Sequence, residues 1–459
     1  MNTNLNETVN MADSALLHKL VDKCKVTYAI PQEAFENANV KRGLRNADGT
    51  GIMAGITKIG LVHGYVVNEG EKTAVEGKLY YRGYDMEELI RGYIAEGRYG
   101  FEECIYILLF GELPDRAQLD EFCSLLNAYR RLPQHFTEDV IWKAPNRNIM
   151  NKLASSILAL YSYDGQPDDT SLENVFRQCI RIIAAIPMIA AHSYAVMRHT
   201  FDGESLNLHY PLDSLSTAQN FLRVVGSDGQ FDEDDARLLD LCLIMHAEHG
   251  GGNNSAFACR VLSSSGTDTY SAISAAIGSL KGPKHGGANI KVEEMVADIK
   301  AHVADITDEG RVRDYLYKIL NKQGGDGSGL IYGMGHAVYT ISDPRAVIIK
   351  GYARDKAEKC GYSDEYELLE IIERNAPGML YELKKSQPGT VCANIDLYSG
   401  LVYKMLHIPS ELFTPVFAVA RASGWCAHRI EELLTGGKIM RPAYKGLCTP
   451  MAYVPMEQR

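Results

Sequence analysis

The sequence lacks the features that mark several classes of protein. Its ten cysteines are spread over 459 residues without a Cys-x-x-Cys pair, so they predict reduced thiols rather than a disulfide framework. Basic residues are not in excess. The formal net charge is −11, which argues against a general nucleic-acid binder and against an anionic-membrane binder. An anionic substrate stays compatible with this charge, because a few converging arginines can reverse the local field.

A long uninterrupted apolar run is also lacking. The longest apolar stretch, residues 182–197, is broken by Pro187, His192 and Ser193 and is too short to cross a bilayer. We therefore expect a buried core helix there. The first 25 residues show neither a secretory signal nor an Arg-rich transit peptide. These absences predict a soluble, cytoplasmic, globular protein.

Strand–helix alternation, internal repeats and low-complexity tracts are missing as well, and the dominant pattern is helical periodicity. Apolar residues recur at helical spacing over 292–306 and over 312–320. Asp85, Asp232 and Asp343 stand where a helix is expected to begin, and a proline follows the last of them at a favourable first helical position. The predicted fold class is therefore mostly α.

A minor β element is expected near the N-terminus. β-branched and aromatic residues gather between Ile56 and Tyr84 around the turn sequence at 68–70, which is typical of a small hairpin. Residues 1–50 are polar and turn-rich, and they predict a short helix followed by an irregular arm.

The length of the chain predicts two domains, because one ordinary core does not serve 459 residues. Glycine-rich breaks at 281–287 and 324–335 flank a more charged helical segment, and a polar stretch follows at 384–389. The predicted parts are an N-terminal arm at 1–54, the first part of a large helical domain at 55–286, a small domain at 287–407, and a return to the large domain with a C-terminal tail at 408–459.

Four short segments hold an unusual share of the histidine, arginine and aspartate residues. His285 and His336 lie beside glycines at predicted loop-to-helix junctions, where a neutral imidazole can donate a hydrogen bond to a carbonyl. Asp396 has apolar neighbours, and desolvation makes a carboxylate a stronger base. Arg421 interrupts an apolar helix and needs an anionic partner. The segments are 245–254, 281–289, 332–345 and 394–398.

These residue types together indicate proton abstraction next to a carbonyl, with an anionic co-substrate held by arginines. Each residue taken alone also has a structural explanation: Asp343, for example, is expected simply to cap a helix. A metal-dependent hydrolase is disfavoured, because His246-Ala-Glu-His249 lacks both the His-Glu-x-x-His spacing and a later Pro-Cys-x-x-Cys. No metal site is predicted, and His246 is expected to pack structurally.

The four segments resemble the signature stretches of the citrate synthase family, in the family's order and at similar spacing. Residues 80–84, residues 101–114 and the stretch from Arg421 to Arg441-Pro442 are also similar. The resemblance covers roughly residues 55 to 445 and points to a bacterial-type member. It implies a two-domain, mostly helical citrate-synthase-like fold. It also implies an acyltransferase of the tricarboxylic acid cycle, which condenses acetyl-CoA with oxaloacetate and water to give citrate and CoA.

The resemblance assigns a role to each site residue. Asp396 matches the base that deprotonates the acetyl methyl group, His285 the residue that stabilises the enol, and His336 the residue that polarises the ketone of oxaloacetate. Arg441 matches an arginine donated across a homodimer interface. Residues matching the oxaloacetate or citrate pocket are His249, Asn253, Arg345, Phe417, Arg421 and Arg441; those matching the CoA site are Leu330, Ile331, Tyr332, Gly333, Met334, Gly335 and Asn394.

Some alternatives stay open. Thr340 stands where many family members carry a basic residue for a CoA phosphate, and Lys322 or Lys350 is a candidate substitute. The same machinery would serve a 2-methylcitrate synthase that uses propionyl-CoA. A non-catalytic CoA-binding or scaffold relative is disfavoured, because the base and both catalytic histidines are present. The expected partners are the two substrates and a second or further copy of the chain, and no cofactor is expected beyond acetyl-CoA as co-substrate.

Overall fold

The computed structural model describes residues 11–46, 49–68, 71–383 and 389–459. The chain divides into two compact units, one formed by Met1–Ala54 with Arg441–Arg459 and the other by Gly55–Met440. In the first unit the described elements are α1 (Met11–Thr27), α2 (Gln32–Asn37) and short 3-10 turns at Arg42–Leu44 and Met456–Gln458. The arm therefore contains more helix than the single short one expected.

The second unit begins with the small antiparallel sheet that the sequence predicts. Its strands β1 (Gly60–Asn68), β2 (Glu71–Tyr81) and β3 (Tyr84–Asp85) pair in the order β1-β2-β3. The tip of the hairpin, 69–70, lies outside the described residues. Two glycines let a distant loop lie directly on this sheet. A Cβ at Gly64 would lie 2.8 Å from the Val338 carbonyl oxygen, and a Cβ at Gly77 would lie 2.1 Å from the Ser342 carbonyl oxygen.

Helices make up most of the rest of the second unit, as expected for a mostly α fold. The first group is α3 (Met86–Ala95), α4 (Phe101–Phe110), α5 (Arg116–Arg130), α6 (Ile149–Ala159), α7 (Leu172–Asp202), α8 (Thr217–Val225), α9 (Glu233–His246), α10 (Asn254–Ser264) and α11 (Thr269–Leu280). The second group is α12 (Ala288–His302), α13 (Glu309–Leu320), α14 (Pro344–Cys360), α15 (Ser363–Glu382), α16 (Asp396–Met405) and α17 (Phe413–Leu434). Shorter turns lie at Thr137–Trp142 (η3), Leu160–Tyr163 (η4) and Ser410–Leu412 (η5).

The predicted helix starts are confirmed, because each aspartate accepts a hydrogen bond from the first turn that follows it. Asp85 accepts from the Glu87 amide, Asp232 from the Asp234 and Asp235 amides, and Asp343 from the Arg345 amide. Such caps satisfy donors that have no partner inside the helix.

One expectation about helix extent was wrong. The periodic stretch 292–306 leaves the helix early, because α12 ends at His302 and Val303 has extended backbone angles. The apolar stretch 182–197 lies in a buried core helix, as expected; this helix, α7, has 31 residues and continues through Pro187. Among the described residues α7 is the one helix long and apolar enough to cross a membrane, and 83% of its apolar window is buried inside the structure.

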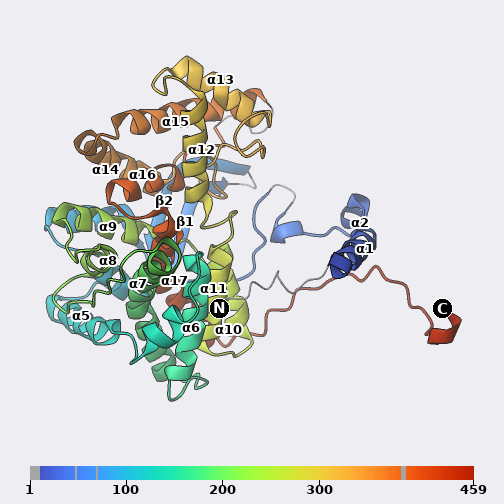
Figure 1. The fold of residues 1–459 in the computed structure, drawn as a ribbon, viewed down its shortest axis with the longest axis horizontal. Helices are drawn as coiled ribbons and strands as arrows, with labels where there is room; N and C mark the ends of the chain where they lie inside the picture. The colour runs from blue at the N-terminus through green and yellow to red at the C-terminus, as the bar shows by residue number, and fades with distance from the viewer. Residues whose placement is uncertain (1–10, 47–48, 69–70, 384–388) are drawn as a thin grey trace. The chain divides into compact units, whose positions relative to one another are not determined.

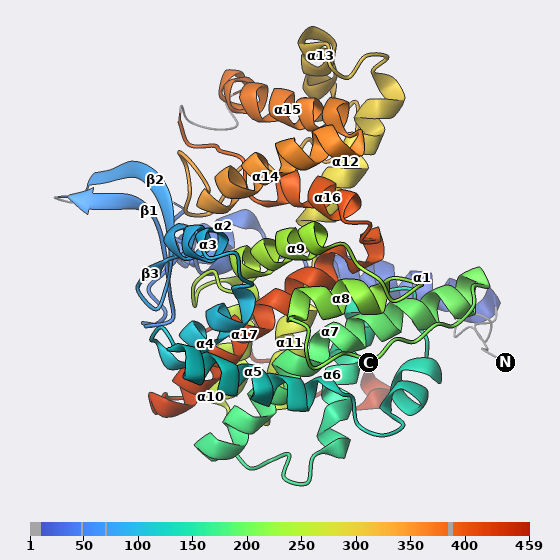
Figure 2. The ribbon, with the colours of Figure 1, turned by 90° about the vertical axis from the view of Figure 1, so that its left-hand side faces the viewer.

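Helix α17 is the central element of the second unit. It packs against α4, α7, α9, α10 and α11, and Figure 2 shows it running through the middle of this group. All its residues from Phe413 to Arg429 are buried, as expected for a helix covered on every side. Helices α12 to α16 gather at one end of the same unit (Figure 1). The division of this unit into a large domain and a small domain at 287–407 stays a prediction.

Candidate active site

The loop that carries His336 fixes the protonation state of this side chain. Its Nδ1 accepts hydrogen bonds from the Val338 amide at 3.1 Å and from the Tyr339 amide at 3.0 Å. An amide N–H only donates, so Nδ1 carries no proton and Nε2–H is the free donor. Burial, followed by the charge of Arg345, lowers the pKa of His336 to about 4. His336 is therefore a neutral hydrogen-bond donor at pH 7.

His336 does not lie at a loop-to-helix junction as expected, because α14 begins only at Pro344. The small sheet supports its loop instead: the Gly77 amide donates to Ser342 Oγ at 3.2 Å, and the Tyr339 hydroxyl donates to the Lys78 carbonyl at 3.4 Å. The Tyr339 ring stacks on the His336 ring with centroids 4.5 Å apart.

His249 lies next to this loop, at the end of the turn that follows α9. Its ring centroid is 5.0 Å from that of His336 and 5.7 Å from that of Tyr339. Its Nε2 is buried without a hydrogen-bond partner among the described residues. Burial and the nearby Arg345 lower the pKa of His249 well below its ordinary value. A neutral imidazole with an open nitrogen is a suitable ligand for a polar substrate group.

Two arginines face this region, and their surroundings differ. Arg345 is 4% exposed, and Asp343 holds it in a fork: Nε donates to Oδ1 at 3.0 Å and Nη2 to Oδ2 at 2.7 Å. Arg421 donates through Nε to the His246 carbonyl at 2.6 Å, while its Nη1 and Nη2 have no partner among the described residues. Burial lowers the pKa of Arg421 to about 10. A buried guanidinium with two open nitrogens is suited to binding a carboxylate.

Phe417 joins the arginine to the histidines. The Arg421 guanidinium lies 4.8 Å from the centre of the Phe417 ring. The ring centroids of His246 and His285 lie 4.3 Å and 6.4 Å from that of Phe417. His246 packs as expected, but both its ring nitrogens are buried without a partner among the described residues, so it borders the same polar region.

His285 lies in the turn before α12, as predicted, and its ring is hydrogen-bonded to Ser255. Its Nε2 is 3.0 Å from Ser255 Oγ, which accepts from the Trp425 indole at 3.0 Å and lies 2.9 Å from Asn253 Oδ1. The Ser255 hydroxyl has one proton, so it donates either to Asn253 Oδ1 or to His285 Nε2. When Ser255 donates to His285 Nε2, that nitrogen carries no proton, and the ring proton of the neutral imidazole is on Nδ1. Burial, followed by Arg421, lowers the pKa of His285 to about 4.

Asp396 begins α16, and its Oδ1 is buried without a partner among the described residues. Burial raises the pKa of this carboxyl to about 7, while Arg345 and Arg421 partly oppose that rise. A carboxyl with this pKa is a base of useful strength near neutral pH.

Asn394 ties Asp396 to the glycine-rich loop at 330–335. It donates through its backbone amide to the Gly333 carbonyl and through Nδ2 to the Gly335 carbonyl, both at 2.9 Å, and its Oδ1 accepts from the Asp396 amide at 2.9 Å. Gly333 has a φ of +80°, and a Cβ there would lie 2.8 Å from Leu397 Cα. Only glycine suits this position.

Comparison with known proteins agrees with this geometry. The sequence model of the family described as "Citrate synthase, C-terminal domain" matches residues 49–443. The chain belongs to the citrate synthase family.

Two relatives and one solved structure illustrate the family. The citrate synthase of Synechocystis sp. is 35% identical over 84% of this chain and 89% of its own length. The 2-methylcitrate synthase of Shewanella oneidensis is 32% identical over 83% of this chain and 92% of its own. The structure of a ternary complex of carboxymethyl coenzyme A and oxaloacetate with the citrate synthase of Thermoplasma acidophilum has a TM-score of 0.73 and 25% identity, over 92% of this chain and 99% of that one.

The citrate synthase fold thus brings together most residues singled out from the sequence. His249 contacts His336, and Phe417 contacts both Arg421 and His285. Arg345 and Arg421 both lower the pKa of Asp396, and Asp396 raises the pKa of Arg421. These three charged groups are therefore close enough to influence one another. Arg441 belongs to the other compact unit, and its role stays a prediction.

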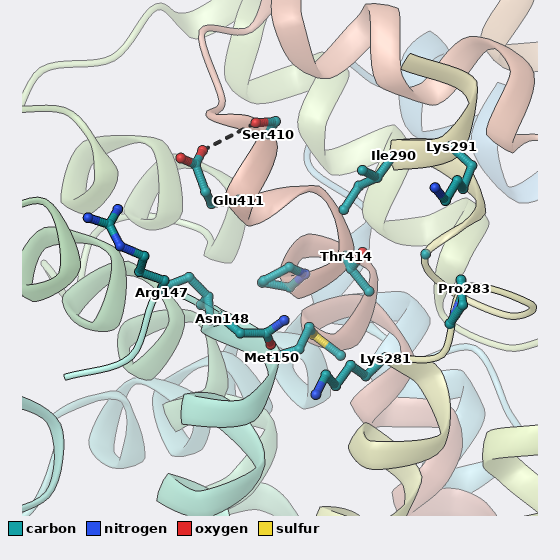
Figure 3. Close-up of a pocket in the computed structure, with 13 residues that line it drawn as sticks. Arg147, Asn148, Met150, Lys281, Pro283, Ile290, Lys291, Ser410, Glu411 and Thr414 are labelled. Carbon is teal, nitrogen blue, oxygen red and sulfur yellow. Dashed lines mark hydrogen bonds between the residues drawn. The ribbon is translucent and has the colours of Figure 1, made fainter. Parts of the chain in front are cut away.

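A pocket of about 370 Å³ lies beside the His285 turn, where the first turns of α6, α12 and α17 meet. Figure 3 shows Arg147, Lys281 and Lys291 spread around it. None of the residues matched to the family's catalytic or oxaloacetate roles lines it. Of the two lysines suggested for CoA phosphate, Lys350 is engaged by Glu373 at 2.6 Å and Glu370 at 3.3 Å. Its charge is therefore already balanced within the protein.

Proposed function

We propose that this chain condenses acetyl-CoA with oxaloacetate and water to give citrate and CoA, as an acyltransferase of the citrate synthase family. The observation that carries the proposal is the pair Asp396 and Arg421. A buried carboxyl with a pKa of about 7 lies within electrostatic reach of a buried guanidinium whose two terminal nitrogens are open. That pair suits proton abstraction beside a bound dicarboxylate.

In the proposed reaction Asp396 takes a proton from the methyl group of acetyl-CoA. This carbon acid is weak, so the developing enolate oxygen needs a donor, which His285 Nδ1 supplies when Ser255 donates to His285 Nε2. The enol carbon then attacks the ketone of oxaloacetate. His336 Nε2–H polarises that ketone and protonates the resulting alkoxide, and the proton that Asp396 took from the methyl group balances the proton that His336 gives up. Water hydrolyses the thioester of citryl-CoA, which releases citrate and the CoA thiol.

The substrates are held at either side of these groups. Arg421, Arg345 and His249 are placed to meet the carboxylates of oxaloacetate. The family resemblance supports a role of the loop at 330–335, which Asn394 ties to Asp396, in holding the CoA adenine. The ternary complex of the Thermoplasma relative with oxaloacetate and a coenzyme A derivative supports this pair of substrates.

Thiol release from a panel of acyl-CoA substrates with oxaloacetate tests the function. We expect acetyl-CoA to give the highest kcat/KM. A higher kcat/KM with propionyl-CoA would instead assign 2-methylcitrate synthase, and no thiol release with any of them would reject the proposal. One methylene in an apolar pocket changes the selectivity by only about 10- to 200-fold, so both substrates need a full titration.

Activity is expected to survive exhaustive chelation, because acid–base groups and arginines account for every step. Within the described part of the chain no group of three or more histidine, cysteine, aspartate or glutamate side chains is placed to hold a metal ion. The measurement is thiol release after dialysis against a strong chelator. Activity lost on chelation and recovered with zinc would contradict the proposed mechanism.

We also propose that the protein works in the cytoplasm as a homodimer or higher oligomer, with Arg441 completing the neighbouring subunit's oxaloacetate site. The family resemblance supports this role of Arg441. Arg441→Ala should then raise the oxaloacetate KM strongly. A heterodimer of Arg441→Ala and Asp396→Asn subunits should regain activity, because one of its pockets carries both changes and the other carries neither. Differently tagged subunits allow its purification, and an intact heterodimer no more active than either parent would reject the trans arrangement.

A further inference from the structure

A buried carboxylate lies behind the substrate-facing arginine, and the proposed reaction does not use it. Glu248 is 0% exposed. Its Oε1 accepts from the Gly250 amide at 2.5 Å and from His428 Nε2 at 2.9 Å, while its Oε2 has no partner among the described residues. Burying a charge in this way is costly unless another charge balances it.

The fold makes room for this side chain through two glycines on separate elements. A Cβ at Gly60 would lie 2.8 Å from Glu248 Cγ, and a Cβ at Gly424 would lie 2.5 Å from Glu248 Oε2. Gly424 is on α17, one turn after Arg421. The unpartnered oxygen therefore faces the helix that carries the substrate-facing arginine, from a position that no larger residue at 424 would allow.

Burial opposes the ionisation of Glu248, but His428 and, after it, Arg421 lower the pKa of this carboxyl below its ordinary value. Arg260 donates to His428 Nδ1 through Nε at 3.1 Å, and a guanidinium cannot accept. His428 therefore accepts from Arg260 at Nδ1 and donates its Nε2 proton to Glu248. The charge of Arg260 is itself balanced by Glu432, at 2.9 Å from its Nη1, and by Glu431.

Each of the two buried arginines of the proposed oxaloacetate site has a carboxylate that balances its charge. Asp343 balances Arg345 in a fork. Arg421 has no hydrogen-bonded carboxylate, but Glu248 is the largest favourable influence on its charge. The position of Arg421 does not depend on Glu248, because the His246 carbonyl and the Phe417 ring hold its guanidinium.

We propose that the negative charge of Glu248 stabilises the charge of Arg421 in the empty site and so limits the affinity for oxaloacetate and citrate. This rests on the proposed function. A substrate dianion takes over the balancing of Arg421, and it must then bind against the charge of Glu248. Without Glu248, the unbalanced charge of Arg421 would hold the product citrate, a tricarboxylate, more tightly and slow its release.

Glu248→Gln in the full-length protein tests the proposal, because it removes the charge and keeps the shape and the acceptor for His428 and Gly250. We expect the Kd values of oxaloacetate and of citrate, measured by calorimetric titration, to fall about tenfold, the order expected for one charge acting over several ångströms. The Tm of the empty variant should fall, and its increase on adding citrate should exceed that of the unmodified protein. A purely structural role would instead weaken binding.

His428→Gln is the matched control, because a glutamine can donate to Glu248 and accept from Arg260, as His428 does. Its Kd for oxaloacetate should stay within about twofold, and tighter binding would contradict the proposal by showing that disturbance alone suffices. Unchanged or weaker binding in Glu248→Gln would overturn it. So would a variant that stays unfolded in saturating citrate, since the bound anion should replace the missing charge. An unmodified protein that binds neither oxaloacetate nor citrate would reject the proposed function itself.

Discussion

Replacing Asp396 by asparagine is expected to lower kcat by about 10²- to 10⁴-fold, the range that a positioned general base contributes. Oxaloacetate binding should change little, because Asp396 is assigned to the acetyl methyl group and not to the ketoacid. Steady-state thiol release, together with oxaloacetate titration, measures both quantities. A variant that keeps near-normal turnover would remove Asp396 from the mechanism.

The pH dependence gives an independent measurement. The pKa of Asp396 is raised to about 7, and the base must be ionised, so kcat/KM for acetyl-CoA should fall about tenfold per pH unit below pH 7. The same shift has a consequence for stability. A carboxyl whose pKa is raised on folding favours the folded state at low pH, and this contribution is lost as the pH rises through 7. Asp396→Asn should therefore have a higher Tm than the unmodified protein at pH 8.

Asp240 provides a matched control for this argument. It is also buried with a raised pKa, of about 8, but it accepts from the Gly100 amide at 2.7 Å and the Phe101 amide at 3.3 Å, at the start of α4. Asp240→Asn should leave the acid limb of the kcat/KM profile where it is. A limb that moved with Asp240 would show that the pH dependence does not report the base.

The helix starts and the hairpin were predicted from the sequence, because interactions between residues close together in the chain determine them. Asp85 and Asp343 are helix caps because a short acidic side chain reaches the amides of the first turn, whatever the rest of the chain does. The hairpin from β1 to β2 follows from its β-branched and aromatic residues in the same way. The end of α12 was missed, because Val303 keeps the apolar spacing of a helix although its backbone has left it.

The site residues were predicted mainly from the resemblance, and their supporting residues were missed. Asp343 was interpreted only as a cap, yet the same carboxylate holds Arg345 in a fork. Ser255 and Trp425 are ordinary residues in the sequence, and they matter only because the fold brings α10 and α17 to His285. Gly424 gives no sequence signal of its own. These contacts join elements far apart in the chain, and periodicity carries no information about them.

Replacing Arg421 by methionine is expected to raise the oxaloacetate KM by about 10²- to 10³-fold, as loss of one partner of a buried charge pair typically does. Methionine keeps most of the length and apolar volume of arginine and removes the charge. The KM for acetyl-CoA should change much less at saturating oxaloacetate. Initial rates of thiol release over a matrix of both substrate concentrations separate the two constants.

Arg429 supplies the control on the same helix. It is 0% exposed, lies two turns after Arg421, and donates to the Thr267 carbonyl. Arg429→Met removes the same atoms from an equally buried position of α17. It should lower the Tm without raising the oxaloacetate KM. If both variants raised this KM alike, the effect of Arg421 would reflect damage to α17 and not the loss of a carboxylate ligand.

The large effect expected for Arg421→Met follows from a difference between Arg345 and Arg421 in the number of guanidinium nitrogens that are free to bind a substrate carboxylate. Asp343 already occupies Nε and Nη2 of Arg345, so a substrate carboxylate finds only part of that guanidinium open. Arg421 offers both terminal nitrogens, and in the empty site they have no partner among the described residues. Substrate binding therefore replaces an unsatisfied buried group with a charge-assisted pair. Arg345→Met should raise the oxaloacetate KM less than Arg421→Met does, and the reverse order would contradict this account of the site.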